Sequence, residues 1–283
     1  MRKVPIFGIL LLIPAFTMFT AVGCKKTETG PQGGTSDGEA QHKEKTTPID
    51  KPTTGTIKGV VTYKGTPPKP KELAKIQEHT DKKYCLTGKD IDKDDQTWII
   101  GEGNGVGNVV IALAPPSGKS FKITDELKKP FKDNPAVLDQ PYCMYRPHIL
   151  ALYAGVQPLI LKNSADIPHN VKVQAGPKDG TFDSGSMRPK SEIKQGPYTM
   201  FPDAIINISC SMHNWMTGKA HLFAHPYFAV SSEKDGTFEI KHVPIDTELT
   251  VRMWHDSTNK WEEPKKITAK AGDNDLALEI WAK

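Results

Sequence analysis

Short apolar runs, each ended by turn-forming residues, are the feature of this sequence that most limits its fold. The runs cover 55–63, 107–115, 148–153, 158–163, 169–175, 204–210, 219–225, 236–243, 248–255 and 276–283, with Gly, Pro, Asn and Asp between them. Only 70–79 and 123–131 have helical character, and no helical period lasts long enough for a bundle. Short strands separated by turn signals are typical of β-sandwiches. The sequence therefore predicts an all-β protein.

The first 24 residues, MRKVPIFGILLLIPAFTMFTAVGC, read as an export signal. A positive start, an apolar stretch from Phe7 to Ala15 and small residues before a cysteine are typical of a secretory signal peptide, here 1–23. AVGC resembles a bacterial lipobox, which implies cleavage before Cys24 and lipidation of its sulfur. Ordinary cleavage that leaves a free thiol at Cys24 is the alternative. Lys25 and Lys26 follow instead of an aspartate that retains lipoproteins in the inner membrane, which favours the outer membrane.

Residues 24–54 are predicted to be a flexible tether. Apart from Ile49 they hold no aliphatic residue larger than alanine. Such a segment buries too little apolar surface to offset its chain entropy. The net charge of +4 is modest, and no basic patch alternates with aromatic residues, so nucleic acid is not an expected partner.

The cysteines suggest one disulfide and one free thiol in the folded part. With Cys24 lipidated, three remain: Cys85, Cys143 and Cys210. An exported protein is in a compartment that favours disulfides. DKKYC at 85 and DQPYC at 143 have similar polar, turn-like settings, so we expect a Cys85–Cys143 bridge. Two unpaired thiols are the alternative.

Two strands end their predicted inward faces with a metal-competent side chain. Side chains alternate between the two faces of a strand. His169 therefore shares a face with Val171 and Val173, and Cys210 shares a face with Ile206 and Ile208. The loop after Cys210, SMHNWMTG, is expected to curl, with Gly218 permitting its exit, so that His213 and Met216 turn toward the same point.

This set of side chains predicts a copper site. Two imidazoles and a thiolate, with methionine as a weak axial ligand, form the ligand set of blue-copper electron-transfer centres. Zinc also binds two histidines and a cysteine, but methionine is a poor zinc ligand and structural zinc sites prefer a fourth Cys or His. No C-x-x-C-H motif is present, so c-type haem is not indicated.

The motif C-x-x-H-x-x-M-x-G-K at 210–219 resembles the ligand loop of the cupredoxins, above all the amicyanins, and more loosely that of plastocyanin and pseudoazurin. Residues 158–173, PLILKNSADIPHNVKV, resemble the cupredoxin hairpin that presents the first histidine. The resemblance implies a Greek-key sandwich over 119–225. It also implies copper on His169, Cys210, His213 and Met216, with Asn170 hydrogen bonding near the thiolate sulfur.

The loop departs from the amicyanin pattern at two positions. Asn214 and Trp215 stand where amicyanin-like loops often carry proline and a smaller aromatic residue. The loop geometry and the reduction potential therefore stay open. The C-x-x-H-x-W-M and HPYFAV elements are also similar to those of exported bacterial proteins of the plastocyanin-like and methylamine-utilisation-like kinds.

The other histidines have no clear role in the sequence. His148, His221 and His225 lie in or near the cupredoxin-like part, and whether any of them binds copper or a second metal stays open. The remaining ones are interpreted as surface or packing residues: His42, His79, His242 and His255.

A second module is predicted around the first. Residues 225–255 resemble the closing half of a carboxypeptidase regulatory-like, transthyretin-type sandwich through D-G-x-F-x-I-x-x-V-P. Residues 55–68 and 107–115 resemble its opening half. The sequence therefore suggests one such sandwich, 55–118 plus 226–283, interrupted by the cupredoxin-like part, since insertion into a surface loop is well tolerated. One larger sandwich is the alternative.

These features lead to three functional hypotheses. The first is a non-enzymatic, lipid-anchored copper protein on the periplasmic side of a bacterial membrane, which carries single electrons between exported partners such as a cytochrome or a dehydrogenase. The second is a copper carrier or buffer. The third is a metal-free β-sandwich binding module. No hydrolase motif such as G-x-S-x-G or H-E-x-x-H is present.

Overall fold

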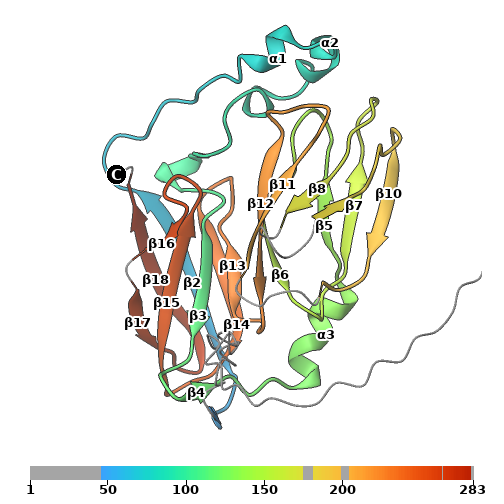
Figure 1. The fold of residues 1–283 in the computed structure, drawn as a ribbon. Coiled ribbons are helices and arrows are strands. Elements are labelled where there is room, and N and C mark those ends of the chain that lie inside the picture. The colour runs from blue at the N-terminus through green and yellow to red at the C-terminus, as the bar shows by residue number, and fades with distance from the viewer. Residues whose placement is uncertain (1–45, 175–180, 199–203, 263, 282–283) are drawn as a thin grey trace, which may run out of the picture. The chain divides into compact units, whose positions relative to one another are not determined.

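The computed structural model describes residues 46–174, 181–198, 204–262 and 264–281. Within these ranges it has eighteen strands and three short α-helices, which confirms the all-β prediction (Figure 1). The predicted signal peptide, the lipidation site at Cys24 and most of the tether lie outside the described residues. No helix in the described ranges combines the length and apolar character needed to cross a membrane.

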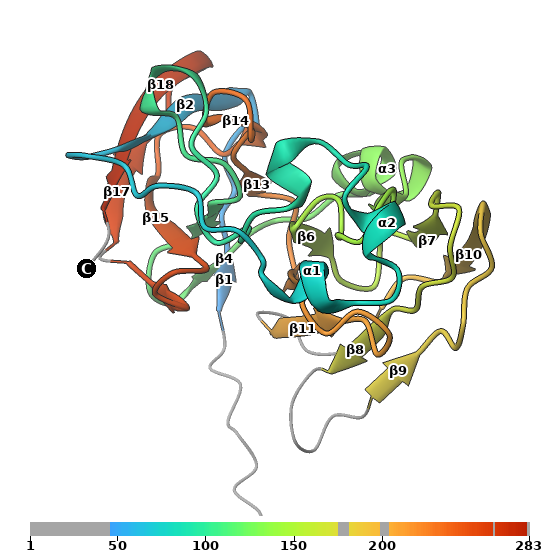
Figure 2. The ribbon, with the colours of Figure 1, turned by 90° about the horizontal axis from the view of Figure 1, so that it is seen from above.

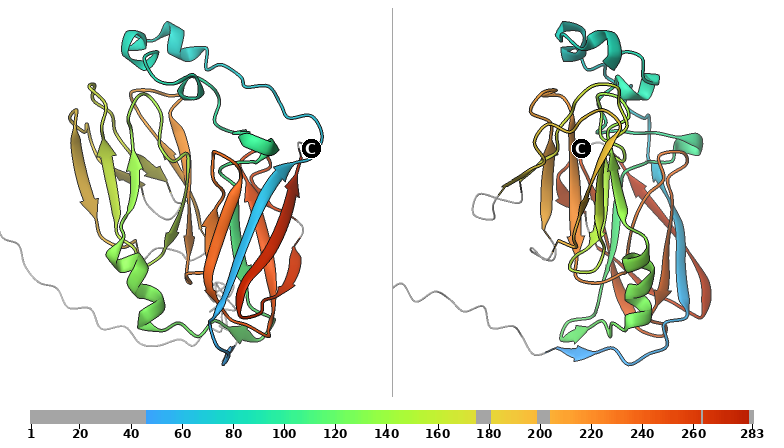
Figure 3. Two further views of the ribbon diagram at one scale, coloured as in Figure 1. Left: turned by 180° about the vertical axis from the view of Figure 1, so that it is seen from behind. Right: turned by 90° about the vertical axis from the view of Figure 1, so that its right-hand side faces the viewer.

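Strands from both ends of the chain build one β-sandwich, which we call the terminal sandwich. One sheet has the order β13-β3-β15-β16, with β17 also paired to β15, and the other has the order β14-β2-β18. The strands are β2 (Gly55–Tyr63), β3 (Val110–Ala114), β13 (Phe228–Val230), β14 (Thr237–Val243), β15 (Glu248–His255), β16 (Lys260–Trp261), β17 (Lys265–Thr268) and β18 (Gly272–Ile280). The long β2 and β18 run parallel, side by side (Figure 3).

Strands from the middle of the chain build a second sandwich, the central sandwich. Its sheets have the orders β10-β7-β5 and β6-β12-β11-β8-β9. The strands are β5 (Ala136–Asp139), β6 (Ile149–Tyr153), β7 (Leu159–Asn163), β8 (Lys172–Gln174), β9 (Thr181–Asp183), β10 (Ser191–Gln195), β11 (Ile205–Ser209) and β12 (Thr217–Phe223). Leu138, Leu161 and Val171 are fully buried between these sheets.

The two sandwiches share a buried apolar contact. Ile149 and Phe223 of the central sandwich pack with Val110, Ala112 and Trp254 of the terminal one. All five side chains are at most 2% exposed. Glu44–Lys283 accordingly form one compact unit.

The segment between β2 and β3 differs from the predicted division of the chain. It contains α1 (Lys75–Glu78), α2 (Lys82–Cys85) and the 3-10 turns η1 (Asp90–Asp92) and η2 (Glu102–Asn104). The sequence predicts that this segment belongs to the interrupted sandwich. In the structure, Ile76 and Cys85 are buried in the core cluster of the central sandwich. Figures 1 and 2 show α1 and α2 beside the ends of β8 and β11. We call residues 75–92 the cap.

The last residues of the predicted tether, 46–54, are part of the fold. Strand β1 (Thr47–Pro48) pairs with β4 (Lys119–Ser120), and Ile49 is buried in the core of the terminal sandwich. The reason is the aliphatic side chain of Ile49, the exception noted within the tether. The third helix, α3 (Asp125–Asp133), overlaps the predicted helical stretch 123–131 and extends two residues beyond it.

Candidate metal centre

Local strand geometry brings His169 and Cys210 to the same end of the central sandwich. His169 precedes β8 and exchanges backbone hydrogen bonds with Met187, at 3.3 and 2.7 Å. Cys210 directly follows β11, after the buried Ile206 and Ile208. Val171 is fully buried as well. Because β8 and β11 run antiparallel, His169 ahead of β8 and Cys210 just after β11 lie at the same end of the sheet. Alternation along each strand gives both residues the inward-facing side.

The loop from Cys210 to Met216 is a closed turn. The amide of Cys210 donates to the carbonyl of Met216 at 3.2 Å, and the amide of Met216 donates to the carbonyl of His213 at 2.9 Å. At the exit, a Cβ on Gly218 would lie 2.8 Å from the carbonyl oxygen of His148, so only glycine fits beside β6. The loop curls as the sequence predicted, and it buries both His213 and Met216.

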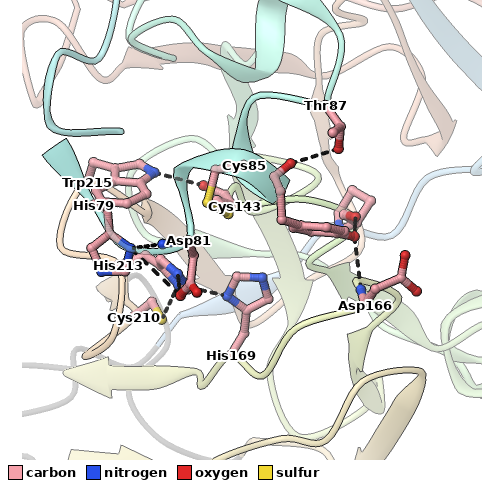
Figure 4. Close-up of a disulfide and its surroundings, with 12 residues drawn as sticks. His79, Asp81, Cys85, Thr87, Cys143, Asp166, His169, Cys210, His213 and Trp215 are labelled. Carbon is pink, nitrogen blue, oxygen red and sulfur yellow. Dashed lines mark hydrogen bonds and ion pairs between the residues drawn. A yellow bond between two sulfur atoms is a disulfide. The ribbon is translucent and has the colours of Figure 1, made fainter. Parts of the chain in front are cut away.

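Three donor atoms meet inside this loop (Figure 4). Nδ1 of His169 lies 3.0 Å from Nδ1 of His213, which lies 3.8 Å from Sγ of Cys210. The three ligand atoms are all within 4.8 Å of one another. The exposed fraction of the side chains is 0% for both histidines and 4% for Cys210. Met216 is fully buried in the same apolar cluster as Cys210.

The spacing of these atoms fits a single metal ion. Metal–nitrogen bonds of about 2.0 Å and metal–sulfur bonds of about 2.3 Å, arranged trigonally, separate nitrogen atoms by about 3.5 Å and nitrogen from sulfur by about 3.7 Å. The observed 3.0 and 3.8 Å are within about 0.5 Å of these values. The third pair, His169 and Cys210, lies within 4.8 Å. Side-chain movements of about 1 Å would bring all three atoms to the trigonal spacing, so the residues present fit the copper ligand set of two histidines and one cysteine.

Both imidazoles are held neutral. Burial, and then the neighbouring His213, lower the pKa of His169 to about 4. Burial also lowers the pKa of His213, although the hydrogen bond to Asp81 opposes it. Nε2 of His213 lies 3.0 Å from Oδ2 of Asp81. Because a carboxylate only accepts, Nε2 carries the proton and Nδ1 keeps a lone pair directed at the cluster.

Asn170 ties the two ligand-bearing segments together. Its Oδ1 accepts from the Ser211 amide at 2.7 Å and from the Cys210 thiol at 3.2 Å. Its Nδ2 donates to Asp183 at 3.0 Å, and its carbonyl accepts from the hydroxyl of Tyr145 at 2.7 Å. The side chain thus lies against the sulfur, where the resemblance placed it.

The cap covers His213, a contact that the sequence did not predict. His79, interpreted from the sequence as a surface or packing residue, lies with its ring centroid 4.8 Å from that of His213 and 5.1 Å from that of Trp215. Its neighbour Asp81 makes the bond to Nε2. The pairing of Cys85 was the available signal, because the bridge to Cys143 brings residues 79–85 to the loop from Cys210 to Met216, which we call the metal-ligand loop for its candidate ligands.

The structure joins Cys85 and Cys143 in a disulfide, with their Cα atoms 5.2 Å apart. Cys210 remains a free thiol. Nε1 of Trp215 donates to the carbonyl of Cys143 at 3.1 Å. The disulfide therefore connects the cap to the metal-ligand loop through the residue that departs from the amicyanin pattern.

The three histidines whose role the sequence left open, His148, His221 and His225, lie outside the groups of metal-competent side chains in the described residues. His148 bonds to Asp256 at 3.1 Å and to the carbonyl of Thr217 at 3.0 Å. Burial lowers the pKa of His221 to about 3 and that of His225 to about 4. In the part of the chain that the structure describes, three groups of metal-competent side chains occur, and all of them contain His213. His148, His221 and His225 belong to none of these groups.

Comparison with known proteins gives weak structural similarities only. No protein-family model matches the chain, and no curated protein sequence matches it. A purple cupredoxin from Nitrosopumilus maritimus is 16% identical, with 31% of this chain and 98% of that one covered, at a TM-score of 0.26. A reduced amicyanin variant is 20% identical, with 39% and 98% covered, at 0.28. A copper-containing nitrite reductase from Thermus scotoductus is 13% identical, with 39% and 25% covered, at 0.28. Similarities at this level carry no weight for function.

Proposed function

We propose that the protein is a type 1 copper protein that carries single electrons. The observation that carries this proposal is the buried convergence of His169, Cys210 and His213 within 4.8 Å. His169, Cys210 and His213 would hold the ion, with Met216 as a weak axial ligand. Bound copper would supply one-electron redox chemistry.

The residues around the donors support electron transfer over copper carriage. A carrier needs ligands that exchange with a partner, whereas the exposed fraction of these ligands is 0–4%. Hydrogen bonds fix them from several sides: Asn170 holds the sulfur, Asp81 holds one imidazole, and Met187 holds the backbone of His169. A site held in one geometry suits an ion that changes charge without changing ligands.

The cellular setting is proposed from the sequence. The chain would be exported, anchored by lipid at Cys24 on the periplasmic side of a bacterial membrane, with the outer membrane favoured. Its partners would be exported redox proteins such as a cytochrome or a dehydrogenase, and it would have no catalytic reaction or nucleic-acid partner of its own. A relation of the terminal sandwich to carboxypeptidase regulatory-like domains remains a sequence-based prediction.

A visible absorption spectrum tests the proposal. The protein loaded with Cu(II) is expected to bind one ion per chain and to show an intense thiolate-to-copper charge-transfer band, which ascorbate bleaches. Cys210→Ser should lose the band and keep its β-sheet circular dichroism. Met212→Leu, at the half-buried methionine of the same loop, should keep the band.

Two results would replace this function with another. A folded protein without the band, which binds Cu(I) tightly, would indicate a copper carrier. A folded protein that binds neither oxidation state would indicate a metal-free binding module.

A further inference from the structure

The proposed ligands have no surface of their own through which an electron enters or leaves. His169, His213 and Met216 are 0% exposed, and Cys210 is 4% exposed. A partner therefore cannot contact His213 directly. Electron transfer slows steeply with distance through protein, so a partner needs the shortest bonded route from a ligand to solvent.

That route runs through the cap. Asp81 is one hydrogen bond from His213, at 3.0 Å, and its side chain is 41% exposed. The ring of His79, 27% exposed, contacts the rings of both His213 and Trp215. Figure 4 shows both side chains beside His213, and because both are partly exposed they connect a buried ligand to solvent.

The cap is fixed in place. The disulfide at Cys85 anchors its middle. The hydroxyl of Tyr84 donates to the carbonyl of Pro141 at 3.1 Å and accepts from the amide of Asp166 at 2.9 Å. Farther along, the buried Asp92 pairs with Arg146 at 2.6 Å. Contacts within α2 and after it therefore keep residues 79–83 in one position over the site.

Exposed lysines surround this position. Lys82 and Lys83 directly follow Asp81 on α2, and Lys75 precedes it on α1; all three are exposed. Glu78 and Asp81 are the two acids of the same stretch, residues 75–83. Three lysines against two carboxylates leave this stretch with a positive charge.

We propose that residues 79–83 form the electron port of the protein and that the port receives a redox partner whose docking face carries carboxylates. The inference rests on the proposed copper function and names the partner class for that site. The two exposed lysines of α2 steer the partner, and Asp81 and His79 lie between its redox group and His213.

Small charged oxidants test the port without a known partner. The copper(I) protein is oxidised in a stopped-flow instrument at low ionic strength by hexacyanoferrate(III), an anion, and by tris(phenanthroline)cobalt(III), a cation. The double variant Lys82→Glu with Lys83→Glu should lower the rate of oxidation by the anion at least about fivefold and raise the rate of oxidation by the cation. The reason is that local charge changes association rates by about 10-fold or more. The matched control is Lys265→Glu with Lys266→Glu, an adjacent exposed pair on β17, which should change either rate less than about twofold.

Both double variants change the net charge of the protein equally. If they also changed the two oxidation rates equally, the effect would come from net charge alone, and the proposal of a port at residues 79–83 would be wrong. A second readout uses the metal-free protein. Hexacyanochromate(III), a paramagnetic anion, should broaden the amide NMR signals of residues 79–83, and the Lys82–Lys83 variant should abolish this broadening. Absence of the broadening in the wild type would also overturn the inference. Absence of the charge-transfer band overturns the copper function instead, so the two failures are distinguishable.

Discussion

Replacing Asp81 by asparagine is expected to raise the reduction potential of the bound copper. Asparagine has nearly the shape of aspartate, and its Oδ1 still accepts from Nε2 of His213, so the imidazole keeps its tautomer. The negative charge, however, is lost. That charge stabilises Cu(II) more than Cu(I), and its removal favours the reduced state.

The size of the effect follows from the distance between the carboxylate and the ion. Oδ2 of Asp81 lies 3.0 Å from His213, and the imidazole ring with a metal–nitrogen bond adds about 4 Å, giving roughly 7 Å. One unit charge at that separation contributes about 0.6 kcal/mol in water and about 2.4 kcal/mol at an effective dielectric constant of about 20. For a one-electron couple these energies correspond to about 25 and 100 mV. Because the Asp81 side chain is 41% exposed, solvent screens it, and we expect about 50 mV.

Redox titration of the charge-transfer band measures this shift. Asp90→Asn is the control, because Asp90 belongs to the same cap but its side chain is 100% exposed and pairs with Lys93; it should shift the potential by less than about 15 mV. A band of unchanged position and intensity in Asp81→Asn shows that the ligand set is intact. A potential that stays the same or falls would refute the reasoning, since the carboxylate would then not act on the ion through His213.

Three further predictions concern stability and the sulfur. Replacing both Cys85 and Cys143 by serine should lower the free energy of unfolding by about 4 kcal/mol in urea denaturation, because their sequence separation is 58 residues; a change below about 1 kcal/mol would contradict it. Burial lowers the pKa of His221 from 6.5 to about 3, so the unfolded chain takes up the proton first. Its contribution to stability is therefore fully present above pH 6.5 and is lost as the pH falls toward 3. His221→Gln should remove about 2 kcal/mol of the stability difference between pH 7 and 5. Asn170→Ala should shift the charge-transfer band rather than abolish it, and should cost about 1–3 kcal/mol of stability through the lost bonds to Ser211 and Cys210; complete loss of the band would mean that Asn170 holds the ligands in place.

Local sequence patterns were enough to predict the fold class and the inward orientation of His169 and Cys210. Alternation along a strand is a property of neighbouring residues, so the buried row that ends in Cys210 could be read from the sequence. The same holds for Val171 behind His169. The curled loop could also be expected, because Gly218 permits a close approach that no other residue allows at 2.8 Å from a carbonyl.

The cap could not be predicted in this way, because its position depends on contacts distant in sequence. Asp81 lies 132 residues before His213, and Cys85 lies 58 residues before its partner. The sequence of the cap, with short polar helices and several lysines, is that of an ordinary surface segment. For the same reason His79 looked like a surface residue, although its ring contacts two residues of the metal-ligand loop.

The arrangement of the two sandwiches explains why the candidate centre is closed. The cap belongs to the connection between β2 and β3, both strands of the terminal sandwich, yet it packs on the central one. The terminal sandwich fixes the two ends of this connection, and the disulfide with the Asp92–Arg146 pair fixes its middle. The terminal sandwich therefore contributes to the metal centre by holding the segment that shields His213. The ligands come from the central part of the chain, and access to them is controlled by a segment from outside it. In this architecture, changes in the cap would alter the proposed redox partner and the reduction potential without altering any of the proposed ligands.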